Sequence, residues 1–456
     1  MTGPTSRFIL FLGVGALLGV LASCGTGAKT CQPGSCTGCC DASGACVAGT
    51  ATSACGSGGL SCSVCAATDQ CSLGVCLPPG GGGGGSAGGG SGGGIGGGSV
   101  GGGTGGSVGG GTGGGSVGGG TGGGSGGGGA GGGLGTPITA PASTWTWVDF
   151  PDSACDDGTP TGIGVNLTNS PNVLVFFNGG GACWDASTCL VLNTATHGPF
   201  GSTQFASVSG ALSGGIFDRN LSGNPFATWS YVFIPYCTGD LHGGQNVAMY
   251  STATGPRAYH HVGHENVLAY LRRLIPTFSS AQKVVVSGSS AGGYGAMLNQ
   301  PDFHAGFPGA TLYVLDDSGP MINGFPAATV QGFFTNWRLD LVVDPVCGTT
   351  CRTDLSAMHS ALATTYGDRS ALLSSLQDQT ISSYAQMTAT QFQTALLALE
   401  LNRIRPQPKD HVFFVTGQTH TMLGNPASFS QNGVFLLPWL TQFVADDPTW
   451  TSVMPP

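Results

Sequence analysis

The apolar positions of residues 137–456 form short runs of β-branched and aromatic residues, and these runs alternate with longer stretches of mixed polarity. Nearly continuous apolar runs of this length are typical of strands buried on both faces of a sheet. We predict strands at residues 173–177, 231–234, 283–286, 311–315, 371–373 and 412–415, and helices at residues 264–274, 291–299, 390–403 and 434–444. The alternation of strands and helices predicts an α/β fold with a mostly parallel sheet and flanking helices.

The start of the chain has a different pattern. An apolar run at residues 8–22 follows Arg7 and, at 15 residues, is shorter than the ~20 residues of a membrane-spanning helix. The run ends in Leu21-Ala22-Ser23-Cys24, which resembles a bacterial lipobox. We therefore predict a signal peptide at residues 1–23, a lipid on Cys24, and an exported lipoprotein on the bacterial cell surface or facing the periplasm, attached to the membrane only through that lipid.

Residues 24–77 are rich in cysteine, with ten cysteines between Cys31 and Cys76 and few large aliphatic residues. Six more cysteines lie between Cys155 and Cys351, so both groups are even in number. In an exported chain, even numbers favour disulfides. The alternative to disulfides is a zinc site, since pairs such as Cys62 and Cys65 have the spacing of zinc-ribbon ligands. No histidine precedes His197, however, so no histidine ligand is available in this segment.

Residues 78–136 are a low-complexity segment of Gly, Ser and Thr. Residues 80–135 contain 40 of the 85 glycines, and no charged residue lies between Gln70 and Val148. This composition predicts a flexible linker. Residues 137–456 then form one compact domain.

The charge of the chain argues against one class of partner. It has 13 Lys and Arg against 22 Asp and Glu, a net charge of −9, and no basic cluster. Because binding to nucleic acid depends on neutralising phosphates, we expect no nucleic-acid partner.

A nucleophile motif follows the predicted strand at residues 283–286. Gly288, Ser290 and Gly292 form G-x-S-x-G, with an apolar strand before the motif and a predicted helix after it. This context is that of a nucleophile elbow, in which a serine lies at a sharp strand-to-helix turn. We predict Ser290 as the nucleophile.

Acyl transfer also needs donors for the developing oxyanion. One is expected from the backbone N–H of the residue after the nucleophile, here Ala291. The glycine-rich loop at residues 178–182 follows an earlier strand and favours Gly180 and Gly181 as the others.

The base and the acid should follow the serine in the chain. His420 lies just beyond the last predicted strand and is preferred over His304, His359 and His411. Asp378 lies just beyond the penultimate strand and is predicted as the acid. The rival acids are Asp317, Asp340 and Asp344.

These residues, in order from Cys155 to the C-terminus, resemble the pectin acetylesterases and the Notum-type carboxylesterases. The motifs are Cys155-Asp156-Asp157-Gly158-Thr159-Pro160, Gly179-Gly180-Gly181 with Cys183 and Cys189, Asn224-Pro225-Phe226, Ile234-Pro235-Tyr236-Cys237-Thr238-Gly239-Asp240, Gly288-Ser289-Ser290-Ala291-Gly292-Gly293, Asp317-Ser318-Gly319 and a terminal histidine. The resemblance implies an α/β-hydrolase with a Ser-Asp-His triad and no cofactor. It also implies the disulfides Cys155–Cys237, Cys183–Cys189 and Cys347–Cys351. Relatives usually carry Trp where this chain has Ala182, and Trp184 is the candidate replacement.

A metal site is the competing interpretation. His260, His261, His264 and Glu265 cluster at the start of a predicted helix, where His260 and His264 would share one face, but no H-E-x-x-H motif exists. We expect no metal there, and His242 is a candidate pocket residue.

The expected function is hydrolysis of acyl esters, acetyl first, on a polysaccharide such as pectin. The alternatives are an esterase for longer acyl chains or polyesters, and a non-catalytic carbohydrate-binding lipoprotein on the same scaffold.

Overall fold

The computed structural model describes residues 39–48, 50–55, 62, 64–65, 70–72, 75–77 and 134–456. The chain divides into two compact units, Met1–Gly122 and Gly123–Pro456. The predicted signal peptide, Cys24 and most of the predicted linker lie outside the described residues. Within the described part of the chain, no helix combines the length and the apolar character that crossing a membrane requires.

The described part of the first unit consists of short antiparallel strand pairs and cystines. The pairs are β1 (Cys39–Cys40) with β2 (Cys46–Val47), β3 (Thr50–Ala51) with β4 (Ala54–Cys55), and β5 (Gln70–Ser72) with β6 (Val75–Leu77). Cys39 forms a disulfide with Cys62, and Cys40, Cys46, Cys55 and Cys65 are also disulfide-bonded. These cysteines therefore act as cross-links in a segment that has few residues with which to build a core.

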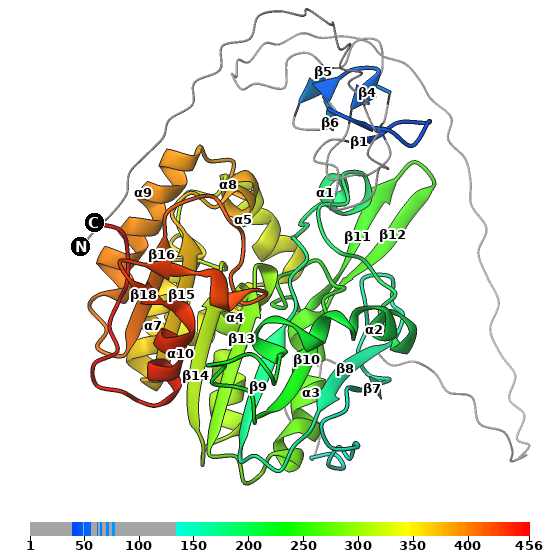
Figure 1. Cartoon of the computed structure of the whole chain (residues 1–456). Coiled ribbons are helices and arrows are strands. Elements are labelled where there is room, and N and C mark those ends of the chain that lie inside the picture. The colour runs from blue at the N-terminus through cyan, green and yellow to red at the C-terminus, as the bar shows by residue number, and fades with distance from the viewer. Residues whose placement is uncertain are drawn as a thin grey trace, which may run out of the picture. The chain divides into compact units, whose positions relative to one another are not determined.

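The second unit is built on one eight-stranded sheet (Figure 1). Its strand order is β16 (Asp410–Val415), β15 (Arg369–Ser375), β14 (Thr311–Asp317), β13 (Lys283–Ser289), β9 (Asn172–Phe177), β10 (Ser230–Ile234), β8 (Thr161–Asn166) and β7 (Thr146–Phe150). The strands from β16 to β10 are parallel to one another, and β8 runs antiparallel between β10 and β7. The prediction of a mostly parallel α/β sheet is confirmed, and all six predicted strands are in it.

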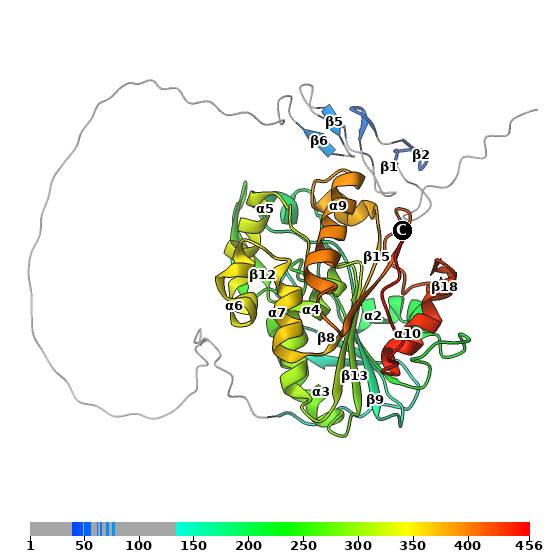
Figure 2. The same ribbon diagram turned by 90° about the vertical axis from the view of Figure 1, so that its left-hand side faces the viewer.

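Alternate residues of each parallel strand pack into two separate cores. Val173 and Val175 of β9 belong to one core, and Leu174 and Phe176 belong to the other. In Figure 2, α3 (Gly263–Thr277), α4 (Ala291–Gly306), α7 (Ala357–Tyr366) and α9 (Ala389–Leu399) lie on one side of the sheet, and α2 (Ser202–Val208) and α10 (Leu436–Val444) lie on the other. Because both faces are covered, the central residues of these strands are apolar on both sides of the sheet.

Two local predictions are wrong. Residues 260–261 end strand β12 (Gly255–His261), which pairs with β11 (Asn246–Thr252) in a hairpin, so His260 and His264 do not share a helical face. Val434–Phe435 form strand β18, paired with β17 (Ser430–Gln431), and α10 begins only at Leu436.

Several elements were not predicted. Strand β8, next to the edge strand β7, has no continuous apolar run because Gly162 and Gly164 interrupt it. Gly162 is required there, since a Cβ would lie 2.1 Å from the carbonyl oxygen of Val148 in β7. The remaining elements are α1 (Ala186–Leu190), α5 (Ala327–Gly332), α6 (Asp340–Cys347), α8 (Gln379–Tyr384), the 3₁₀ turns η1 (Ala211–Ser213), η2 (Gly215–Phe217), η4 (Gly348–Arg352) and η6 (Pro426–Ser428), and the π-helical turns η3 (Phe333–Trp337) and η5 (Glu400–Ile404).

Candidate active site

Ser290 occupies a sharp turn between β13 and α4. Its backbone has φ 60° and ψ −123°, a region that costs a residue with a side chain on the order of 1–3 kcal/mol. The turn is held by two backbone bonds, Ser290 N–H to the Asp317 carbonyl at 2.8 Å and Gly293 N–H to the Ser290 carbonyl at 2.9 Å. Glycine is required beside it, because a Cβ on Gly292 would lie 1.9 Å from the Phe177 carbonyl oxygen. This is the geometry of a nucleophile elbow.

Asp378, which is fully buried, pairs with the partly exposed His420 beyond the ends of β15 and β16. Asp378 Oδ2 lies 2.7 Å from His420 Nδ1. Its Oδ1 accepts the N–H groups of Thr380 and Ile381 at 2.9 and 3.0 Å, as the N-cap of α8. These three bonds fix the orientation of the carboxylate, which is fully buried.

The pairing determines which histidine nitrogen is available. With Nδ1–H donated to Asp378, the imidazole leaves Nε2 as its acceptor, which is the arrangement a general base requires. His420 Nε2 is buried and has no hydrogen-bond partner among the described residues. The structure thus brings Asp378 and His420 together and leaves the second nitrogen unengaged.

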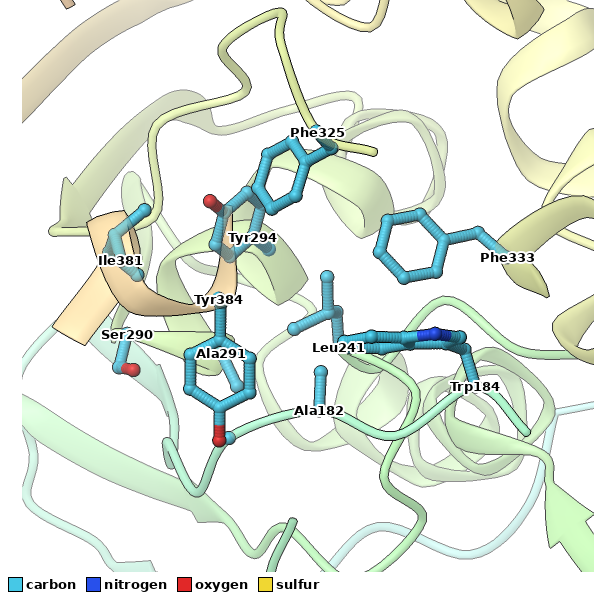
Figure 3. A pocket seen from close by; sticks show the side chains of 11 residues that line it. Ala182, Trp184, Leu241, Ser290, Ala291, Tyr294, Phe325, Phe333, Ile381 and Tyr384 are labelled. Carbon is cyan, nitrogen blue, oxygen red and sulfur yellow. The ribbon is translucent and has the colours of Figure 1, made fainter. Parts of the chain in front are cut away.

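Ser290 opens into a small apolar pocket. In Figure 3, Ser290 and Ala291 lie at one end of the pocket, and Trp184 and Phe333 lie at the other. The lining residues are Gly181, Ala182, Trp184, Leu241, Ser290, Ala291, Tyr294, Phe325, Phe333, Ile381 and Tyr384.

The predicted oxyanion donors lie near Ser290, but only two of the three line the pocket. Ala291 is the first residue of α4, so its N–H has no acceptor within the helix, and Ala291 and Gly181 both line the pocket. Gly180 is adjacent but is not a lining residue, and its carbonyl accepts Thr196 N–H at 2.7 Å. A Cβ on the neighbouring Gly179 would lie 3.0 Å from Ser290 Cβ, so this loop packs directly against the elbow.

The rival acids are not bonded to His420 and have hydrogen-bond partners of their own. Asp340 and Asp344 are in α6, where they form ion pairs with Arg338 and Arg352. Asp317 ends β14 and accepts bonds from Ser289 Oγ and from the N–H groups of Met422 and Leu423.

The rival histidines are not paired with Asp378. His304 Nδ1 lies 3.0 Å from Asp368, and His411 Nδ1 lies 3.3 Å from Ser452 Oγ. Burial lowers the pKa of His359 to about 4.

The wall around Ala182 differs from what relatives imply. Trp184 lines the pocket and packs edge-to-face on Phe333, with ring centroids 5.7 Å apart, so an aromatic wall is present two residues later in the chain.

His242, a candidate pocket residue, is not a lining residue. It is buried, its Nε2 lies 2.9 Å from the Asn178 carbonyl, and burial lowers its pKa to about 4. A neutral His242 therefore supports the glycine loop from below.

Several lining residues have no signal in the sequence. Tyr384 comes from α8, a six-residue helix without a clear apolar pattern. Its hydroxyl donates to the Thr194 carbonyl, which places the tyrosine against the loop of Gly181. Phe325 and Phe333 come from the long segment after β14, where only the fold brings them to the serine.

Three disulfides join the cysteine pairs that the resemblance implies: Cys155–Cys237, Cys183–Cys189 and Cys347–Cys351. Among the described residues, one set of three possible metal ligands lies within 4.8 Å, namely Cys183, Cys189 and His261. Its two sulfurs are joined to each other, so these residues do not form a site for a metal in this structure. His264 instead lies 2.8 Å from the amide oxygen of Asn299.

The sheet and the turn at Ser290 define an α/β-hydrolase fold. Residues 145–342 match the family described as pectinacetylesterase. The predicted resemblance to pectin acetylesterases and Notum-type carboxylesterases is thereby confirmed.

Named relatives come from both branches. The chain is 31% identical over 149 residues to palmitoleoyl-protein carboxylesterase notum2 of Xenopus laevis, a match that covers 32% of this chain and 29% of that protein. It is 28% identical over 169 residues to pectin acetylesterase 7 of Arabidopsis thaliana, covering 36% of this chain and 39% of that protein. The matched segments thus span about a third of these relatives.

A solved structure shows the same fold over a longer stretch. The Wnt deacylase Notum from Drosophila superposes with a TM-score of 0.53 and 17% identity, covering 68% of this chain and 95% of that chain. At this identity the likeness concerns the fold alone.

Proposed function

We propose that this protein is a serine carboxylesterase with Ser290 as nucleophile, His420 as general base and Asp378 as the acid that orients it. One observation carries the proposal. A strained Ser290 lines an apolar pocket, and helix α8, which lines the same pocket, is capped by the carboxylate of Asp378 that is bonded to His420. The names of the relatives, all carboxylesterases or pectin acetylesterases, support it.

In the proposed reaction, His420 Nε2 takes the proton of Ser290 as Oγ attacks the acyl carbon. The backbone N–H groups of Ala291 and Gly181, with Gly180 as a further candidate, stabilise the oxyanion. His420 then gives the proton to the leaving alcohol oxygen, and the acyl group stays on Ser290. Water, activated by His420, releases the carboxylic acid and restores the serine.

The first candidate substrate is an acetylated polysaccharide, which the name of the plant relatives supports. The protein would then act as an exported, lipid-anchored enzyme on extracellular polymer. The disulfides in both units favour an oxidising compartment.

A longer acyl chain is the second candidate. The pocket walls are almost entirely aromatic or aliphatic. A second apolar cavity shares the side chains of Leu241, Tyr294, Phe325 and Phe333 with the first. Apolar walls of this kind suit an aliphatic acyl chain.

The test uses the full chain and a fluorophosphonate probe. Wild type is expected to be labelled on Ser290, and Ser290→Ala is expected to lose both labelling and turnover. A series of p-nitrophenyl esters from acetyl to dodecanoyl, together with acetylated pectin, then separates the substrates. A wild-type chain that takes no probe and hydrolyses none of these esters would show a non-catalytic binding protein.

A further inference from the structure

Asp317 is a buried carboxylate that the proposed reaction does not use. It ends β14 and is fully buried, and the register of the sheet places it directly beside Ser289 at the end of β13. No Lys or Arg contacts it among the described residues; its partners are hydroxyl and backbone N–H groups. A charged group buried at this cost needs a structural or functional reason.

On one side, Asp317 holds the backbone of the nucleophile. Ser289 Oγ donates to Asp317 Oδ2 at 2.7 Å, and Ser290 N–H donates to the Asp317 carbonyl at 2.8 Å. The strained residue Ser290 is thus fixed to β14 by its own N–H and by its neighbour's side chain.

On the other side, Asp317 holds the segment that follows His420. The N–H of Met422 donates to both carboxylate oxygens at 2.9 and 3.0 Å, and the N–H of Leu423 donates to Oδ2 at 3.0 Å. Between these residues and His420, Thr421 adopts φ 67° and its N–H donates to Ser318 Oγ at 3.3 Å. The loop of His420 therefore turns sharply and is anchored on Asp317 and Ser318.

We propose that Asp317 is a positioning residue: one carboxylate links the strand end that presents Ser290 to the loop that presents His420, and so sets the approach of base to nucleophile. The inference rests on the proposed esterase function. It differs from the role of Asp378, which contacts the imidazole itself.

The chemistry of the contacts indicates why the residue is an aspartate. Every group that contacts the side chain is a hydrogen-bond donor, so an ionised carboxylate can accept from all of them. Burial raises the pKa of Asp317, and the bonds from Leu423, Ser289 and Met422 act in the opposite direction. An asparagine has the same shape, but its NH₂ group would face at least one of these donors.

The experiment compares Asp317→Asn, Ser289→Ala and their combination in the full chain. Because a displacement of about 1 Å can cost on the order of 100-fold in rate, Asp317→Asn is expected to lower kcat by that order with KM nearly unchanged. Ser289→Ala is expected to lower kcat about tenfold by freeing one side of the link. The double variant should be no slower than Asp317→Asn, because both changes break one connection.

Two controls separate positioning from general destabilisation. Asp410→Asn removes another buried carboxylate of the sheet, far from Ser290, and should leave kcat unchanged. The rate of fluorophosphonate labelling by the folded protein should fall in parallel with kcat for Asp317→Asn, while a purely structural role would lower only the melting temperature.

The outcomes are distinct. Wild-type kcat and labelling in folded Asp317→Asn overturn the inference, while loss of labelling in Ser290→Ala still supports the esterase. If Asp317→Asn does not fold, Ser289→Ala is the deciding variant, and a kcat equal to that of wild type in Ser289→Ala overturns the inference. Independent losses that multiply in the double variant also overturn it. Activity that persists in Ser290→Ala overturns the proposed function instead.

Discussion

Buried carboxylates lie at both ends of the parallel strands, and their partners differ. At the carboxyl ends, Asp317 and Asp378 are fully buried, and each accepts bonds from backbone N–H groups and from one side chain of the site. At the amino ends, Asp410 Oδ1 has no hydrogen-bond partner among the described residues, and Asp368 contacts His304 and Gln300 of α4.

The difference shows that burial alone does not identify a functional carboxylate. Asp316, also buried at the carboxyl end of β14, accepts a bond from Gly319 N–H, and its Oδ2 has no hydrogen-bond partner among the described residues. What distinguishes Asp317 and Asp378 is that each joins two segments of chain around Ser290. This fits the general rule that ligands bind at the carboxyl ends of strands in open α/β sheets. For the acids at the amino ends, we expect an effect on stability and not on the reaction. The predictions below test this contrast.

The largest effect is expected at Asp378. In Asp378→Asn the amide can no longer select the imidazole tautomer that leaves Nε2 free or stabilise the imidazolium, so kcat should fall by a factor on the order of 10⁴. Steady-state hydrolysis of a soluble ester measures this, with circular dichroism to show folding. Turnover near that of wild type, combined with a complete loss in Asp317→Asn, would mean that Asp317 is the acid.

The position of Asp378 beyond a strand end, where it pairs with His420, could be predicted because the parallel strands contain continuous apolar runs, so their ends are visible in the sequence. The same reasoning located Ser290, His420 and the glycine loop. It failed where the same residue pattern occurs in both helices and strands. His260 and His261 have the polar character of a helix start, yet they lie in strand β12 and pair with residues of β11. It could not find Tyr384 or Phe333, because their positions depend on how α8 and η3 pack and not on a local pattern.

The second prediction concerns acidification. An imidazolium cannot accept the proton of Ser290, so kcat/KM should fall on acidification. The other histidine near the loop, His242, has a pKa lowered to about 4 by burial and therefore stays neutral at higher pH. A pH–rate profile on a soluble ester measures the fall, and a flat profile down to pH 4 would argue for a different base.

A smaller effect is expected at Tyr384. Tyr384→Phe removes the hydroxyl that donates to the Thr194 carbonyl, beside Gly181, while keeping the ring in the pocket wall. The glycine loop should then be less well held, and we expect kcat to fall about tenfold with little change in chain-length preference. Tyr250→Phe, in the hairpin, is the matched control. Equal losses in the two variants would mean that Tyr384 acts through stability alone.

At the amino ends, Asp410→Asn should change stability and not rate. Burial raises the pKa of Asp410 to about 7, above the ~3.9 of an unfolded chain. Between these values only the folded chain holds the proton, so stability falls as pH rises from about 4 to about 7 and is then constant.

Asparagine does not titrate, so the variant should be more stable than wild type at pH 8, by on the order of a few kcal/mol, and should lose that advantage towards pH 4. Thermal unfolding at both pH values measures this, with exposed Asp152→Asn as the control. The same gain at both pH values would contradict the assignment of the proton to Asp410.

The smallest effect is expected from removing the first unit. The second unit has its own sheet and two cores, and its first contacts are made by Gly135 and Ile138: Gly135 N–H donates to the Arg272 carbonyl at 2.9 Å, and Ile138 N–H donates to Thr277 Oγ1 at 2.7 Å. A chain that begins at Gly123 keeps these bonds to α3. It should hydrolyse soluble esters with the kcat/KM of the full chain, within about twofold, because none of the groups assigned to the reaction precedes Gly180.

A chain that begins at residue 140 loses both bonds and the buried Ile138, and should unfold at a lower temperature with the same kcat while folded. If the chain from Gly123 folds but loses turnover on soluble esters, the cysteine-rich unit contributes to the active site, and the separation of chemistry from anchoring proposed for this protein is wrong.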